Sequence, residues 1–164
     1  MSLSDRRTLV FALLALPLAG CGFTPVYGPE GAGGMLQNRL RADDPADKDA
    51  FDLVARLEER LGRPSATALR LAYDIDVTEE STAATPARFA SRIRVVGQVR
   101  YRIIQSDAVL AEGKVDAFTA YSTTTTPLAT RAAAEDARRR LMVILADGIV
   151  TRLLASARQW MPLA

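Results

Sequence analysis

The sequence contains no histidine and a single cysteine among its 164 residues. Without histidine, the chain lacks the side chain that most often serves as general base or metal ligand near neutral pH. A single cysteine forms neither a disulfide within the chain nor a cysteine-based zinc site. These shortages weigh against an enzyme and a metal centre. We therefore predict a non-enzymatic protein with no metal and no separate cofactor.

An excess of charge of one sign is also missing. Without the N-terminal Asp5, Arg6 and Arg7, the chain keeps 19 basic and 18 acidic residues, a formal charge of +1. This balance gives no indication of a nucleic-acid partner, and we expect none. The composition, 49% hydrophobic and 24% charged, is ordinary for a globular protein, and the length suits one domain.

Long hydrophobic runs are absent as well, because the apolar run Thr8–Leu16 is too short to span a bilayer. It follows Arg6 and Arg7, and a charged start before a short apolar run is typical of a secretory signal peptide. The run is followed by Leu18-Ala19-Gly20-Cys21, which resembles the lipobox of bacterial lipoproteins. We predict a signal peptide over residues 1–20. The alternative is an ordinary cleaved signal with a stray cysteine.

The lipobox predicts that Cys21 carries a diacylglyceryl group on its thiol and an acyl chain on its freed amine. Two or more acyl chains hold a protein at a membrane stably, at about 0.8 kcal/mol per buried CH₂. Gly22 stands where an aspartate would resemble an inner-membrane retention signal. We therefore predict a periplasm-facing protein anchored to the outer membrane by its lipids. Residues 21–34, rich in glycine and proline, are predicted to be a lipidated tether, followed by one domain over residues 35–164.

The first predicted helix spans Asp49–Leu61, and Gly62 and Pro64 end it. Its predicted stripe at helical spacing is Phe51, Val54, Leu57, Glu58 and Leu61. Before it, residues 35–40 are a candidate short strand, and residues 42–49 are predicted to be an acidic loop.

A second helix is predicted from Pro127, behind a Thr126 cap, to about Ala157. Its apolar surface is wider than one stripe, so it is either deeply buried or faces a partner. Trp160 and Met161 are predicted to lie in a loosely held tail.

Period-two alternation predicts three strands. The first covers residues 69–78, before a polar loop over 79–88. Residues 92–104 and 109–122 then form a long hairpin around a turn at 105–107. The predicted fold class is α+β, with two helices packed on one face of a small, mainly antiparallel sheet (an α/β sandwich).

Several short motifs occur along the chain: the start Leu18–Gly28, Ala120-Tyr121-Ser122 after the long hairpin, and the helix segments Ala133–Ala137 and Asp147–Leu153. Together they resemble the LptE family of lipopolysaccharide-assembly lipoproteins, especially its alphaproteobacterial members. The resemblance implies an α/β sandwich that plugs and helps assemble the outer-membrane β-barrel LptD during lipopolysaccharide transport. It also implies lipopolysaccharide itself as a ligand. Residues 35–49, where the family has its first strand, depart from the pattern.

Four arginines on one face of the predicted strand 92–104 form the sharpest candidate site. An arginine guanidinium can bind a phosphate through two parallel hydrogen bonds, so the stripe could contact lipid A phosphates or acidic groups of the barrel. The alternative is a solvated sheet face whose arginines pair across the hairpin with Glu112 and Asp116. The candidate residues are Arg92, Arg94, Arg100 and Arg102.

Two further clusters are interpreted as structural. The acidic group Asp74, Asp76, Glu79 and Glu80 has no accompanying nucleophile or histidine, and suits a solvated or protected strand edge. The threonine run 123–126 is interpreted as a polar connector. Two rival functions remain open. A lipid-carrying lipoprotein without a barrel partner would need a sizeable apolar cavity between sheet and helices, and a hydrolase would need an unrecognised site.

Overall fold

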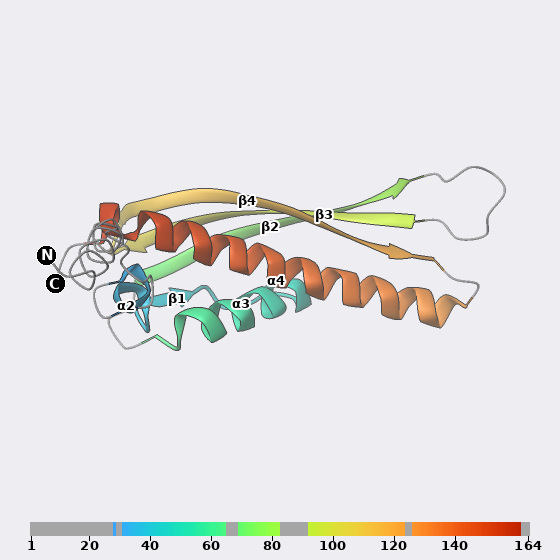
Figure 1. Ribbon diagram of the computed structural model, residues 1–164, viewed down its shortest axis with the longest axis horizontal. Coiled ribbons are helices and arrows are strands. Elements are labelled where there is room, and N and C mark those ends of the chain that lie inside the picture. The colour runs from blue at the N-terminus through green and yellow to red at the C-terminus, as the bar shows by residue number, and fades with distance from the viewer. Residues whose placement is uncertain (1–27, 29–30, 65–68, 83–91, 124–125, 162–164) are drawn as a thin grey trace, which may run out of the picture.

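A computed structural model describes residues 28, 31–64, 69–82, 92–123 and 126–161. The helices are α2 (Ala32–Leu36), α3 (Lys48–Leu61) and α4 (Pro127–Trp160). The strands are β1 (Leu40–Ala42), β2 (Leu69–Thr82), β3 (Arg92–Gln105) and β4 (Ala108–Ser122). The three long strands and α4 run along the length of an elongated molecule (Figure 1).

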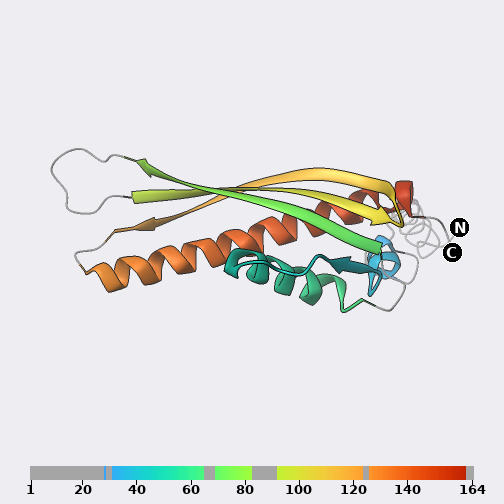
Figure 2. The same ribbon diagram turned by 180° about the vertical axis from the view of Figure 1, so that it is seen from behind.

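The sheet has the order β1-β2-β3-β4, with β1 parallel to β2 and the other neighbours antiparallel. Figures 1 and 2 show α3 and α4 on the same side of the sheet, with the other face left uncovered by helices. The predicted α+β fold, two helices on one face of a mainly antiparallel sheet, is therefore confirmed. Among the described helices, none is long and apolar enough to cross a membrane.

The hairpin of β3 and β4 has the predicted turn, in which Ser106 adopts a positive φ of 55°. Along β3 the predicted inner residues are buried or half-buried, from Ile93 to the fully buried Ile103. The register shifts once, between Ile103 and Ile104, which is where the strand bends toward the turn. The prediction that β2 ends near residue 78 was wrong, because pairing with β3 continues to Thr82.

Helix α3 begins and ends close to the predicted positions. The Asp47 carboxylate accepts a hydrogen bond from the Ala50 amide at 2.8 Å, and Gly62, with φ of 79°, ends the helix. The predicted stripe was partly wrong, since Phe51 is 61% exposed and Glu58 is exposed. The buried stripe is Ala50, Leu53, Val54, Leu57 and Leu61. Its spacing fits a helix better than the stripe that began at Phe51.

The segment before α3 differs from the prediction in two ways. Residues 32–34, assigned to the tether, belong to the short helix α2, and the strand lies at Leu40–Ala42 rather than 35–40. Tertiary packing explains α2, because Leu36 is fully buried and α2 contacts α4. The Asn38 amide then donates to the Leu61 carbonyl at 2.7 Å and positions β1 beside β2.

The end of α4 is firmly packed, so the predicted loose tail was wrong. Trp160 is the last helical residue, and its Nε1 donates to Ser156 Oγ at 3.0 Å. Met161 is 5% exposed and belongs to the core. The start of α4, with Thr126 as the N-cap residue and Pro127 first in the helix, is as predicted, although the Thr126 side chain makes no capping hydrogen bond.

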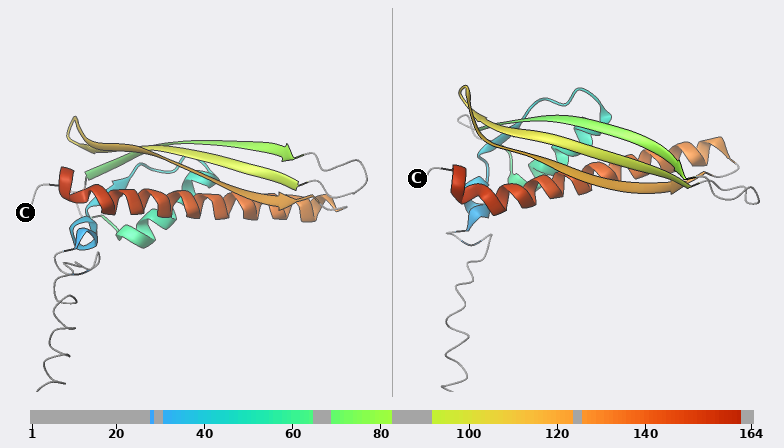
Figure 3. Two further views of the ribbon diagram at one scale, coloured as in Figure 1. Left: turned by 45° about the horizontal axis from the view of Figure 1, so that its top comes forward. Right: turned by 90° about the horizontal axis from the view of Figure 1, so that it is seen from above.

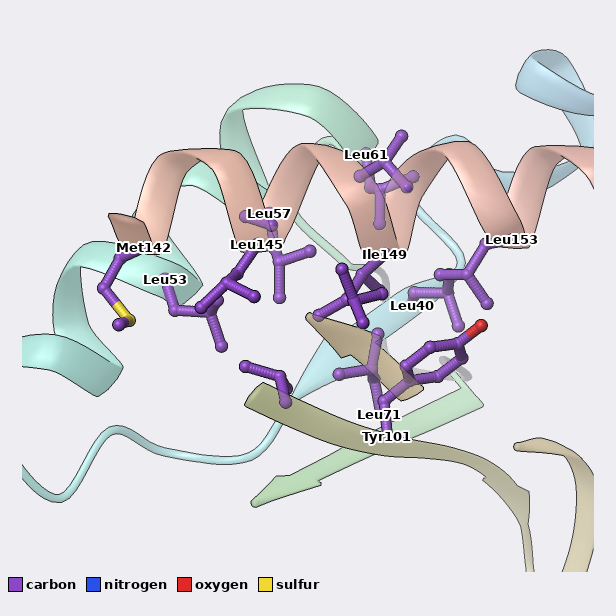
Figure 4. Packing of buried hydrophobic residues seen from close by; sticks show 14 of the residues in the cluster. Leu40, Leu53, Leu57, Leu61, Leu71, Tyr101, Met142, Leu145, Ile149 and Leu153 are labelled. Carbon is purple, nitrogen blue, oxygen red and sulfur yellow. The ribbon is translucent and has the colours of Figure 1, made fainter. Parts of the chain in front are cut away.

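The core fills the layer between the sheet and the two helices. Figure 4 shows side chains of α4, such as Leu145, Ile149 and Leu153, directed toward Leu71 and Tyr101 of the sheet and toward residues of α3. Glycines allow the helix to approach closely. A Cβ at Gly97 would lie 2.8 Å from a methyl of Leu141, and one at Gly148 would lie 2.6 Å from a methyl of Val115. The interface is therefore packed without spare room at these points.

A candidate partner-facing surface on the open sheet face

The open face of the sheet carries the four predicted arginines. Arg92, Arg94, Arg100 and Arg102 alternate with inward-facing residues of β3, and all four are exposed. The predicted strand face is therefore observed, whereas the predicted contact with lipopolysaccharide or a partner stays a prediction. Figure 3 shows this face from above, with β3 between β2 and β4.

The arginines form two separate pairs rather than one continuous stripe. Six residues of extended strand separate Arg94 from Arg100, which corresponds to about 20 Å. Gln98 occupies the face between them. A single phosphate group therefore cannot contact both pairs.

Arg100 is paired across the sheet with β2, not with β4. Its Nη2 donates to Asp74 Oδ2 at 2.5 Å, and this hydrogen bond raises the pKa of Arg100 above its ordinary value. The alternative in which Asp116 pairs with an arginine was wrong. Asp116 lies opposite Gln98, accepts a hydrogen bond from it at 3.0 Å, and forms an ion pair with Lys114 at 3.2 Å.

The pair Arg100 and Arg102 borders a groove of about 580 Å³ on the open face. Arg102 lies opposite Glu112 in the strand register, and Lys114 lies opposite Arg100. Ala72 lies opposite Arg102 on the other neighbouring strand, and its small side chain helps to form the hollow. The groove therefore combines three cations with two carboxylates, Asp74 and Glu112, and suits a ligand or partner that carries both charges and hydrogen-bonding groups.

The second pair lies beside an exposed aromatic ring. The Arg94 guanidinium stands 4.1 Å from the centre of the Phe118 ring, and Phe118 is 58% exposed. Cation–π contact of this kind keeps an arginine extended over the sheet while its N–H groups stay available. Arg92 lies one position further along the same face, opposite Ser122.

The predicted acidic cluster is divided among several partners. Asp74 pairs with Arg100, whereas Glu79 accepts hydrogen bonds from Arg138 at 3.1 Å and from the Tyr121 hydroxyl at 3.1 Å. Among the residues that the structure describes, no group of three potential ligands could hold a metal ion. Asp74 and Glu79 therefore serve as ion-pair partners of arginines.

Two arginine networks on the helices were not predicted from the sequence. Arg138 links α4 to Asp49 of α3 and to Glu79 of β2, at 2.9 and 3.1 Å. The Asp147 carboxylate of α4 forms ion pairs with Arg56 at 3.0 Å and with Arg60 at 3.1 Å, and both arginines belong to α3. The helical spacing of Arg56 and Arg60 was an available signal, but their partner lies 87 or more positions away in the sequence.

The remaining predicted site lies outside the described residues. Cys21 belongs to the part of the chain before Gly28, so its lipidation stays a prediction from the sequence. Within the threonine run, residues 124–125 are likewise outside the description, while Thr126 precedes α4 as expected.

No family model matches the sequence, and no curated protein matches it. Solved structures do share its fold. A candidate lipoprotein from Caulobacter crescentus CB15 is 18% identical, with a TM-score of 0.61 over 78% of this chain and 96% of its own. A minor lipoprotein from Acinetobacter baumannii is also 18% identical, with a TM-score of 0.57 over 73% and 94%. Rare lipoprotein B from Shewanella oneidensis is 13% identical, with a TM-score of 0.55 over 75% and 97%. The chain thus has a fold found in proteins described as bacterial lipoproteins.

Proposed function

We propose that this protein is an outer-membrane lipoprotein of the LptE type. Acyl groups on Cys21 anchor it facing the periplasm, and the sandwich domain plugs and helps assemble an LptD-type β-barrel that delivers lipopolysaccharide to the cell surface. The protein acts by binding rather than by catalysis. The lipobox and the fold shared with lipoproteins support the anchor, and the motif resemblance supports the barrel partner.

The proposal is supported mainly by the shape and packing of the domain. It is an elongated sandwich with a tightly packed interior and one open polar face. Leu141, Leu145 and Ile149 are fully buried between sheet and helices, and Gly97 approaches α4 too closely to leave a ligand cavity there. A plug needs such a rigid body together with a face of polar side chains for its partner. A lipid carrier would need an apolar cavity at the same interface, so the packing favours the plug.

A hydrolase is the weaker rival. The chain has no histidine, and the carboxylates Asp74, Glu79 and Asp147 are each held by arginine. This arrangement supports a binding role.

Co-purification tests the proposed partner. A chain tagged after Ala164 is extracted from outer membranes in mild detergent, and the proteins that accompany it are identified. We expect a large outer-membrane barrel in near-equal amount. A Cys21→Ser variant serves as control, and it should lose acylation and outer-membrane attachment. Recovery of the acylated chain alone, or with lipid only, would refute the barrel partner and favour the lipid carrier.

The arginine pairs can be tested separately for lipopolysaccharide binding. We propose that Arg100 and Arg102 contact its phosphates, so Arg102→Glu should weaken binding by tenfold or more, as expected for loss of about 1.5–3 kcal/mol in a charge-assisted hydrogen bond. Arg139→Glu on α4, which covers the other side of the sheet (Figure 1), changes the net charge equally; it serves as the matched control and should leave binding unchanged. Unchanged binding in Arg94→Glu, Arg100→Glu and Arg102→Glu would leave only the solvated-face interpretation.

A further inference from the structure

The described chain begins at one end of the elongated molecule. The Gly31 amide donates to the Gly28 carbonyl at 2.9 Å, and α2 follows directly and packs against α4. The same end contains the turn between β3 and β4 and the C-terminal ends of α3 and α4 (Figures 1 and 3). We call this region the anchor end and define it as residues 28, 31–43, 61–64, 69–70, 103–111 and 155–161.

Gly28 lies seven positions after Cys21, and even a fully extended chain over seven positions reaches only about 25 Å. Acyl chains on Cys21, which belong to the proposed function, would therefore hold the anchor end within that distance of the bilayer. The three long strands, β2, β3 and β4, have 14 or 15 residues each, or about 45–50 Å. The opposite end can therefore lie well away from the membrane.

Basic residues are in excess at the anchor end. The described part of this end carries five arginines, Arg39, Arg41, Arg63, Arg70 and Arg158. It carries two carboxylates, Asp43 and Asp107, and Glu58 reaches Arg63 from the adjacent helix turn at 3.7 Å. The local charge is therefore about +2, although the whole chain is nearly neutral.

The opposite end shows no such excess. We compare residues 76–82, 92–98, 116–123 and 126–140, which lie together there (Figure 2). Their six arginines are Arg92, Arg94, Arg131, Arg138, Arg139 and Arg140. Their six carboxylates are Asp76, Glu79, Glu80, Asp116, Glu135 and Asp136. Over the residues that the structure describes, the anchor end thus carries the larger positive charge.

Structural roles account for only some of the anchor-end arginines. Arg70 forms two hydrogen bonds with Asp43, at 2.6 and 2.8 Å, and Arg158 lies in the last turn of α4, where a cation suits the helix dipole. Arg39 and Arg41 are both exposed, and neither forms an ion pair with any residue in the described ranges. Their charges are therefore available to a partner outside the domain.

We propose that the anchor end, led by Arg39 and Arg41, rests on the anionic phospholipid headgroups of the membrane that holds the acyl chains. Headgroup phosphates supply the negative surface that attracts clustered arginines, and the attraction extends over about one Debye length. Val109, which is 50% exposed beside the hairpin turn, adds an apolar contact at the same end. The contact fixes which end of the molecule lies at the bilayer surface, and the opposite end lies up to about 45–50 Å from it.

Vesicle flotation tests this surface without the acyl chains. The chain from residue 21 onward, carrying Cys21→Ser, retains every described helix and strand and is mixed with vesicles of phosphatidylcholine alone or with phosphatidylglycerol added. We expect flotation only with the anionic vesicles and its loss at high salt. Arg39→Glu with Arg41→Glu should lower partitioning at least tenfold, since each arginine near an anionic surface contributes roughly a fivefold factor. Arg39→Lys with Arg41→Lys should retain it.

A matched control changes the net charge equally at the opposite end. Arg131→Glu with Arg139→Glu also lowers the charge by four, and it should leave flotation almost unchanged. Equal losses in the two double variants would overturn the proposal, because they would indicate an effect of overall charge only. Equal flotation with neutral vesicles would overturn it as well. Neither outcome depends on a barrel partner, so the proposed plug and this membrane surface can fail independently.

Discussion

The contact between Gly97 and Leu141 allows a sharp test of the packed interior. Gly97 lies on β3 and Leu141 on α4, and a Cβ at position 97 would be 2.8 Å from a Leu141 methyl and 3.2 Å from its Cγ. Leu141 is fully buried, so its side chain has little room to move away. We therefore expect strong coupling between substitutions at the two positions.

The expected free energies follow from this geometry. Leu141→Ala removes a fully buried side chain and should destabilise the protein by about 3 kcal/mol. Gly97→Ala overpacks the interface at a cost of about 2 kcal/mol, from which about 1 kcal/mol is recovered because alanine is better than glycine within a strand. In the double variant the new methyl occupies space that Leu141 has vacated and keeps a tight contact, at 3.0 Å, only with a methyl of Leu145, so the total loss should be about 2 kcal/mol rather than the sum of about 4.

Urea denaturation followed by circular dichroism measures all four free energies of unfolding, provided that the m-value stays constant. Leu128→Ala is a control on the same helix, because Leu128 is 77% exposed and its loss should change stability by less than about 0.5 kcal/mol. An additive double variant would refute the reasoning. It would mean that the sheet and α4 are separated by adaptable space, as a lipid-carrying interior requires.

Two further predictions concern charged and titrating groups. Burial raises the pKa of Tyr73 and Tyr101 above the ordinary value of about 10. The unfolded chain therefore releases these protons first, and stability should fall as pH rises above about 10, as measured by tyrosinate absorbance together with thermal unfolding. Asp147→Asn should lower Tm more than Glu135→Gln, because Asp147 accepts from two arginines of α3 and Glu135 only from Arg131 on its own helix. Equal changes in Tm would indicate that the link between α3 and α4 contributes no more than a surface pair.

The fold was predictable where a segment buries one face along its whole length. Alternation over β3 and β4 placed the hairpin and its turn correctly, since a slip of one residue would have exposed residues such as Val95 and Val99. The region before α3 was harder to predict. Helix α2 contains Gly33 and Gly34, which disfavour a helix locally, and it is held by the burial of Leu36 against the rest of the core.

From the sequence, the candidate site could be predicted only as a group of arginines on one face of a strand. Alternation establishes that Arg94 and Arg100 point to the same side of a sheet, but it contains no information about which residue lies beside each of them. The register supplies that information by placing Asp74 beside Arg100 and Phe118 near Arg94. Charged residues that are far apart in the sequence, such as Glu79 and Arg138, become partners only through the register and the crossing of α4.

The two arginine pairs therefore occupy different environments if the anchor end rests on a membrane. The groove beside Arg100 and Arg102 lies on the anchor-end half of β3, whereas Arg92 and Arg94 begin the strand at the opposite end. A ligand that enters from the bilayer would reach the groove first, and a partner that approaches the opposite end would meet Arg94 and Phe118 first. Substitutions at the two ends should consequently separate lipopolysaccharide binding from barrel binding, because about 20 Å of strand lies between the pairs. Joint loss of both activities from a substitution at either end would mean instead that the barrel and the lipid contact the whole open face together.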